Sequence, residues 1–211
     1  MKPIWLASYP RSGNTLVRTI LFHCFNLKTG SVYSEDFGGN KRLEEYVGHI
    51  EQNSDRSISF PEGNLPIIKT HASHKGDNFT IYVVRDGRAA AASFWHFTNP
   101  KVPMRKIIDG NHKFGKWCDH LDFWKPLSRP NTLLLKYEDI LDDFDDSLKK
   151  ISLFLDREIV SRHLPSRNQI AQDDGKWVRK KTDWREVLTS EDLDRFNELN
   201  FQHLDQFNYL K

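Results

Sequence analysis

The chain has 211 residues, a formal net charge of +2, 38% hydrophobic residues and 28% charged residues. This length fits one domain, residues 1–211, with a core large enough to fold alone, and the weak net charge without a basic block argues against a nucleic-acid partner. No apolar run approaches the roughly 18 residues of a membrane span, and a strand predicted from residue 3 or 4 leaves no room for a signal peptide. Because the two cysteines, Cys24 and Cys118, make no disulfide framework, we expect a cytoplasmic location.

Apolar runs rich in Ile, Leu and Val alternate with helical stretches along the chain. None of the four runs alternates cleanly with polar residues, which is typical of parallel strands buried on both faces. We therefore predict an α/β fold with a central parallel sheet flanked by helices. The predicted strands are Ile4–Ser8, Leu65–Lys69, Thr80–Val84 and Thr132–Lys136. The predicted helices are Leu16–Phe25, Arg88–Phe97, Ile140–Leu155 and Ser190–Leu199, the last with Ser190 as its cap.

The loop between the first strand and the first helix is the most informative segment. Tyr9–Thr15 reads YPRSGNT, and its small residues let several backbone N–H groups point at one spot beside the partial positive charge of a helix N-terminus. Arg11 adds a fixed charge. The loop lacks the G-x-x-x-x-G-K-[ST] pattern of nucleotide-triphosphate loops, so it favours a single phosphate or sulfate. The alternative is an ordinary strand-to-helix turn with exposed polar residues.

Cationic residues also stand at the ends of the other predicted strands. Lys69 ends the second strand just before His71, Arg85 follows the third strand, and a lysine ends the fourth. Because ligands of parallel α/β sheets bind at the carboxyl ends of the strands, we expect these cations to converge on one ligand with more than one anionic group. For Arg85 the alternative is an ion pair with Asp86 or Asp139.

Five segments, in chain order, resemble motifs of the sulfotransferase family, which uses 3′-phosphoadenosine 5′-phosphosulfate (PAPS) as its sulfuryl donor. They are similar to its 5′-phosphosulfate loop Tyr-Pro-Lys-Ser-Gly-Thr-Thr, its Lys-Thr-His strand end, its 3′-phosphate motif, its Tyr-Glu-Asp and, in shortened form, its Arg-Lys-Gly…Gly-Asp-Trp-Lys. The resemblance implies the P-loop-like sulfotransferase fold and transfer of a sulfuryl group from PAPS to a hydroxyl, or to an amine, of a small molecule. The segments are Tyr9–Thr15, Lys69–His71, Tyr82–Arg88 with Ser93, Tyr137–Asp139 and Val178–Arg185.

The chain also departs from these motifs. Arg11 replaces the usual Lys and keeps its charge, and Asn14 replaces a Thr and can still donate a hydrogen bond. Leu16 stands where many members have a Trp that packs on adenine, so another group must cover the base. The last motif, with Arg179 and Lys180, lacks its first Gly and is compressed.

The resemblance implies two sets of donor-binding residues, one for the 5′-phosphate and one for the 3′-phosphate. The forked guanidinium of an arginine suits the second phosphate. Tyr137 would pack near the donor, or would instead be a core aromatic residue. The residues of the 5′ set are Arg11, Ser12, Gly13, Asn14 and Thr15, and the other donor-binding residues are Arg85, Ser93, Arg179 and Lys180.

The same resemblance assigns the chemistry to His71, Lys69 and Arg11. His71 would accept the proton of the acceptor hydroxyl, because the pKa of imidazole lies near neutrality. Lys69 would contact the sulfuryl group or the leaving phosphate, and Arg11 would offset charge near the bridging oxygen. These cations would replace a metal, so no metal is expected. For His71 the alternative is a partly buried structural histidine.

The sequence says less about the acceptor. Segment 28–64 carries seven acids against four bases, which predicts an acidic cover that disfavours polyanions and tolerates neutral or cationic small molecules. The aromatic-rich stretch 95–124 would line an acceptor pocket or belong to the core. Two other functions stay open: a small-molecule kinase on a related fold, and a non-catalytic module that binds adenosine 3′,5′-bisphosphate.

Overall fold

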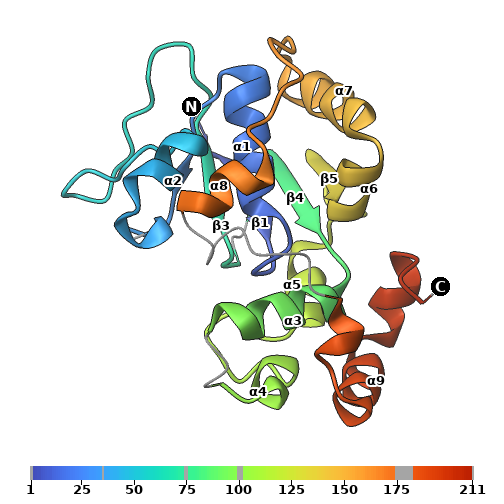
Figure 1. Cartoon of the computed structure of the whole chain (residues 1–211). Helices are drawn as coiled ribbons and strands as arrows, with labels where there is room; N and C mark the ends of the chain where they lie inside the picture. Colours follow the sequence, from blue (N-terminus) through green and yellow to red (C-terminus); the bar gives the residue numbers. More distant parts are fainter. Residues whose placement is uncertain (1, 35, 74–75, 99–101, 174–182, 211) are drawn as a thin grey trace.

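A parallel five-stranded sheet runs through the described residues (Figure 1). The computed structural model describes residues 2–34, 36–73, 76–98, 102–173 and 183–210. The strand order β2-β3-β1-β4-β5 places β1 in the centre of the sheet. Three predicted strands are confirmed with their predicted bounds, β3 begins two residues later than predicted, and the short edge strand β2 was not predicted. The strands are β1 (Ile4–Ser8), β2 (Gly30–Ser31), β3 (Ile67–Thr70), β4 (Thr80–Val84) and β5 (Thr132–Lys136).

Parallel pairing brings the carboxyl ends of these strands to one edge of the sheet. Ala7 of β1 pairs with Thr70 of β3 and with Tyr82 of β4. Since β3 ends directly before His71 and β4 ends directly before Arg85, both residues emerge at the edge where β1 opens into its loop.

Several predicted helix boundaries are wrong, and the last helix ends at Gln206 and not at Leu199. Ile140–Leu155 is two helices, because Asp143 adopts an extended conformation (φ −136°, ψ 82°) and its side chain caps the second helix by accepting from the Asp146 N–H. The cap of the last helix is Thr189, with Ser190 as the first helical residue. The helices are α1 (Asn14–Phe25), α2 (Lys41–Tyr46), α3 (Gly87–Phe97), α4 (Met104–Ile108), α5 (Trp117–Trp124), α6 (Tyr137–Asp142), α7 (Phe144–Leu155), α8 (Arg167–Asp173) and α9 (Ser190–Gln206), with 3₁₀ turns at η1 (Asp36–Gly39) and η2 (Trp184–Glu186).

Helices cover both faces of the sheet because neighbouring strand residues face opposite ways. Leu6 packs in a core with α1 and α7, whereas Ala7 packs in a second core with α3, α4, α5 and α9. Figure 1 shows α1 and α7 in the upper half of the view and α3, α4 and α9 in the lower half. Cys24 and Cys118 are both buried free thiols. Within the ranges given above, no helix is both long enough and apolar enough to cross a membrane.

Candidate active site

A cavity of about 1030 Å³ lies at the carboxyl edge of the sheet. Residues that follow β1, β3, β4 and β5 line it, so the cations at separate strand ends meet in one place. Ser12 is fully buried and does not line the cavity, and Arg179 and Lys180 lie outside the described residues. The sequence-predicted site residues that line the cavity are Arg11, Gly13, Asn14, Thr15, Lys69, His71, Arg85, Ser93 and Tyr137.

Two residues in left-handed conformations shape the loop before α1. Arg11 has φ 67°, and Gly13, the N-cap of α1, has φ 110°. A Cβ atom at Gly13 would lie 2.6 Å from Cδ2 of Tyr137, so the ring and the backbone both require glycine. The first turn of α1 has neither a capping side chain nor an acidic residue. Its N–H groups and partial positive charge therefore suit an external anion.

Ser12 and Asn14 sit inside this loop. The Asn14 Nδ2 atom donates to the Leu6 carbonyl oxygen (3.2 Å) and to the Ser8 Oγ atom (3.3 Å), so this amide braces the loop against β1. The buried Ser12 hydroxyl has no hydrogen-bond partner among the described residues.

Arg11 and Arg85 are held next to each other on the wall of the cavity. The Arg11 Nε atom donates to Ser93 Oγ at 3.2 Å, and its guanidinium lies 5.0 Å from the centre of the Phe97 ring. Arg85 Nη1 donates to the Arg11 carbonyl oxygen at 3.1 Å, and its guanidinium lies 4.6 Å from the centre of the Tyr137 ring. Two planar cations and a serine hydroxyl thus form one wall of the cavity, an arrangement whose chemistry suits an anion.

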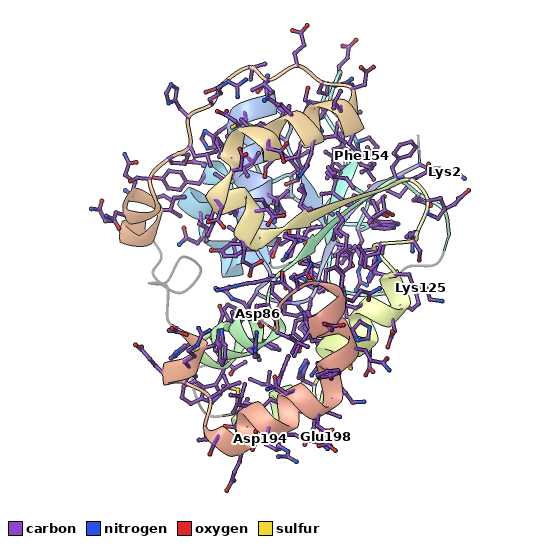
Figure 2. The ribbon with its side chains drawn as sticks, turned by 90° about the vertical axis from the view of Figure 1, so that its right-hand side faces the viewer. Lys2, Asp86, Lys125, Phe154, Asp194 and Glu198 are labelled. Atoms are coloured by element: carbon purple, nitrogen blue, oxygen red, sulfur yellow. The ribbon has the colours of Figure 1, made fainter. Side chains whose placement is uncertain are left out.

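The alternative ion pair of Arg85 with Asp86 is not formed among the described residues. Asp86 instead pairs with Arg88 at 2.8 Å and caps α3 by accepting from the Arg88 N–H. Figure 2 shows Asp86 near the middle of the molecule, beside the start of α3. Arg85 therefore remains on the cavity wall.

Lys69 belongs to a buried ion cluster that the sequence did not indicate. Its Nζ atom lies 2.5 Å from Oδ1 of Asp36, whose Oδ2 atom accepts from Arg18 Nη1 at 2.5 Å. Arg18 is fully buried and also donates to Thr29 Oγ1 at 2.7 Å, while its Nη2 atom lies 2.8 Å from His49 Nδ1. Asp36 thus bridges a cation in the cavity and a cation under it.

The charges in this cluster stabilise one another. Burial would raise the pKa of Asp36, but Lys69 and Arg18 outweigh it and hold that pKa well below its usual range. Burial lowers the pKa of Lys69, and the Asp36 carboxylate opposes that effect. Asp36 therefore favours the charged form of Lys69.

The backbone of β1 fixes the tautomer of His71. The His71 Nδ1 atom lies 2.7 Å from the Ser8 carbonyl oxygen, and because a carbonyl only accepts, Nδ1 carries the proton and Nε2 keeps a lone pair. The His71 N–H donates to the Tyr33 hydroxyl at 3.1 Å. Burial, and then the charge of Lys69, hold the pKa of His71 well below its usual 6.5. The imidazole is therefore neutral near pH 7 and can accept a proton.

Aromatic rings surround His71 on the cavity side. Tyr33 stacks on it with ring centroids 5.9 Å apart, and Phe114 meets it edge-on at 5.6 Å. Phe97 also lines the cavity, whereas Trp117 and Trp124 are buried in the core. The aromatic-rich stretch 95–124 thus contributes both to the cavity wall and to the core, and its role toward an acceptor stays a prediction.

The acids of segment 28–64 do not form the acidic cover that the sequence predicted. Among those that the structure describes, only Asp36 lines the cavity, and both of its oxygens are paired with cations. Glu44 and Glu51 each pair with Lys41 instead. The lining cations include Arg56 and Lys113 in addition to the predicted ones. The described part of the cavity is therefore positively charged.

Sequence analysis missed Asp36, Arg18, Tyr33 and Phe114. Asp36 stands among several other acids, and Arg18 reads as one polar residue on an amphipathic helix. The described part of the chain contains no group of three or more His, Cys, Asp or Glu residues that could hold a metal ion.

A parallel α/β sheet with an anion-binding loop after its central strand, facing cations from neighbouring strand ends, defines a class of phosphate- or sulfate-handling proteins. The model of the sulfotransferase domain matches residues 1–208. The chain belongs to the sulfotransferase family.

Similar proteins with curated descriptions include human sulfotransferase 2B1 and the amine sulfotransferase of Oryctolagus cuniculus. The human protein is 28% identical over 179 residues, which cover 77% of this chain and 48% of the relative. The rabbit protein is 24% identical in an alignment that covers 97% of this chain and 81% of the relative. The chain thus spans about half the length of the human relative.

Two solved structures share the fold. Mouse sulfotransferase SULT7A1 complexed with PAP has a TM-score of 0.66 and 21% identity, covering 96% of this chain and 84% of that chain. Retinol dehydratase, in complex with androsterone and inactive cofactor PAP, has a TM-score of 0.63 and 18% identity, covering 96% and 80%. The predicted P-loop-like sulfotransferase fold is confirmed.

Proposed function

We propose that this protein is a PAPS-dependent sulfotransferase that moves a sulfuryl group to a hydroxyl, or to an amine, of a small molecule. One observation carries the proposal: the loop before α1, Lys69, His71, Arg85 and Ser93 line a single cavity. Membership of the sulfotransferase family and fold neighbours bound to PAP support this choice of donor.

The loop and the arginine wall fit such a donor. The backbone N–H groups of 13–15 at the uncapped start of α1 would hold the 5′-phosphate, while the Ser12 N–H donates to the Tyr9 carbonyl oxygen. Arg11 would offset the charge that develops on the leaving oxygen. Arg85 and Ser93 would bind the 3′-phosphate, with Tyr137 packed beside it. Arg179 and Lys180 remain proposed donor-binding residues.

His71 would act as the general base. When the acceptor oxygen bonds to sulfur, the bond between sulfur and the phosphate oxygen breaks, and the hydroxyl proton passes to His71 Nε2. Lys69, held by Asp36, would stabilise the transferred group. The donor supplies the sulfuryl group, and these cations would take the place of a metal.

Replacing His71 with alanine tests the proposal. We expect the H71A variant to lose transfer to a panel of small phenols, alcohols and amines while keeping its affinity for PAP. The affinity follows from the rise in melting temperature with PAP concentration, since a ligand of the folded state stabilises by RT ln(1 + [L]/Kd). Loss of PAP binding in this variant would contradict the assigned role.

Two alternative functions have distinct outcomes. Greater stabilisation by ATP with magnesium than by PAP would favour a small-molecule kinase, although the loop lacks the Gly-Lys pair that such an enzyme uses. Tight PAP binding without turnover on any acceptor would favour a non-catalytic binding module. We also propose that the protein acts in the cytoplasm without a nucleic-acid partner, on the basis of its sequence.

A further inference from the structure

We propose that the acceptor carries a negatively charged group, such as a carboxylate, and that Lys113 binds it. This inference rests on the proposed sulfuryl transfer and narrows its substrate class. It names a specificity residue that no sequence motif indicated.

Lys113 is placed close to the proposed base. It lies in the loop between α4 and α5, and its Nζ atom is 4.8 Å from the centre of the Phe114 ring and 5.6 Å from that of Tyr33. Both rings contact His71, at centroid distances of 5.6 and 5.9 Å. The ammonium and the imidazole thus contact the same two rings.

The charge of Lys113 has no counterpart in the described part of the cavity. No described carboxylate pairs with Lys113, and the one acid among the described lining residues is Asp36. Both oxygens of Asp36 are already engaged by Lys69 and Arg18. An anionic group on a bound molecule would therefore meet an unneutralised ammonium, which favours binding by charge-assisted hydrogen bonding.

Lys113 contacts different rings from the two arginines assigned to the phosphates of the donor, and it shares the Tyr33 ring with Lys69, whose Nζ atom lies 5.1 Å from the ring centre. Arg11 and Arg85 contact each other and the rings of Phe97 and Tyr137. The contacts of Lys113 are instead with the rings around His71, where the acceptor hydroxyl must approach to lose its proton. This placement assigns Lys113 to the acceptor.

The neutral rings and the cation together describe the acceptor. Tyr33 and Phe114 line the cavity with apolar ring atoms, while Lys113 offers one positive charge at an exposed position on the cavity wall. A hydroxylated aromatic or similar flat molecule with one anionic group fits both features. A molecule with a free amine at that point would face repulsion.

A matched set of probes tests the inference. These are 3-(4-hydroxyphenyl)propionate, its amide and tyramine, which present an anion, a neutral group and a cation on the same phenol. We expect the carboxylate to have the highest kcat/KM. The K113A variant should lower kcat/KM for the carboxylate about tenfold and change it for the amide by less than about twofold, as for loss of one charge-assisted hydrogen bond.

Calorimetry keeps the inference testable without turnover. The carboxylate is titrated into protein saturated with PAP, and we expect K113A to weaken its binding about tenfold and to leave PAP binding unchanged. K106A is the matched control, since Lys106 is an exposed lysine of α4 that does not line the cavity. It should behave like the unmodified protein.

Three results would overturn the inference. They are a preference for the amide or for tyramine, an equal loss for all three probes in K113A, and a loss of PAP affinity in K113A. Absence of turnover with every probe, together with Lys113-dependent binding of the carboxylate, would instead count against the proposed transfer and support the anion site.

Discussion

At the scale of single residues, Asp36 has the widest influence on the site. It joins Lys69, which lines the cavity, to Arg18, which is fully buried below it. Removing one member of such a cluster leaves a buried charge without its partner, which costs far more than losing a surface pair. The charged form of Lys69 is therefore favoured by a residue that belongs to none of the sequence motifs.

Replacing Asp36 with asparagine should destabilise the protein and change its pH profile. We expect a loss of about 3–5 kcal/mol in the free energy of unfolding, because Arg18 and Lys69 lose their carboxylate. Without that carboxylate the pKa of Lys69 falls further, so the activity of D36N should decrease as pH rises, where the unmodified protein keeps its activity. Urea titration and a pH–rate profile measure the two effects.

Asp109 provides the matched control for this change. It also accepts from two arginines, Arg105 and Arg195, but it does not line the cavity. D109N should cost no more than about 1 kcal/mol and should leave the pH profile unchanged. An equal effect of both substitutions would mean that Asp36 has no particular relation to Lys69.

Gly13 is the second residue on which the site depends. G13A should abolish PAP-induced stabilisation, because the alanine Cβ would clash with Tyr137 and the residue would resist its φ of 110°. Gly39 is the control, since it has φ 76° but nothing within 4 Å of an added Cβ. G39A should cost about 1 kcal/mol and keep the thermal shift with PAP. A normal PAP response in G13A would contradict the role of the loop.

At the scale of secondary-structure elements, local sequence patterns predicted the strands correctly where a single apolar run marked the strand. The strands β1, β4 and β5 follow from apolar runs that end at turn residues or at a polar helix start. The break between α6 and α7 was missed because the apolar spacing continues through it, while Asp143 prefers to cap. The two-residue strand β2 was missed because so short a segment has no period of its own.

Loss of the Asp143 cap should affect stability alone. We expect D143A to lower the free energy of unfolding by about 1 kcal/mol, since its carboxylate accepts from the Asp146 N–H at the start of α7. D142A removes the same charge one residue earlier, without a cap, and is the control. Urea midpoints compare the two, and a smaller effect of D143A than of D142A would show that the cap contributes nothing.

At the scale of the whole molecule, the protein holds one buried and several half-buried histidines in neutral form. Burial lowers the pKa of His120 to about 3 and also lowers the pKa of His49 and His112, while burial and Lys69 lower that of His71. In the unfolded chain these groups gain protons near pH 6.5. Between that pH and their lower folded pKa values, the unfolded state binds more protons than the folded state.

Stability should therefore fall as the pH decreases from about 6.5. Each histidine that is neutral when folded and protonated when unfolded contributes up to about 1.4 kcal/mol per pH unit. The free energy of unfolding from urea titrations at pH 7.5, 6.5, 5.5 and 4.5 measures this slope. H120Q should reduce the slope by up to about 1.4 kcal/mol per pH unit, which corresponds to one proton. H163Q, at an exposed position, is the control. A pH-independent free energy over this range would rule out the neutral burial.

More of the proposed donor site than of the proposed acceptor site could be predicted from the sequence. The loop before α1 and the cations at strand ends are local patterns, and parallel topology brings them together whatever the loops between them do. Asp36, Tyr33 and Lys113 reach the cavity from segments whose paths depend on tertiary packing, so no spacing rule places them. For the same reason the acidic count of segment 28–64 was a poor guide to the charge of the cavity. The single-domain organisation stays a prediction.

The hydrogen bond from His71 Nδ1 to the Ser8 carbonyl has a consequence for substitutions around this histidine. Because the acceptor is a main-chain oxygen, no single side-chain replacement removes it, and the orientation of the imidazole comes with β1 itself. Rings and charges beside His71 can therefore be replaced to suit other molecules while the lone pair of Nε2 keeps its direction.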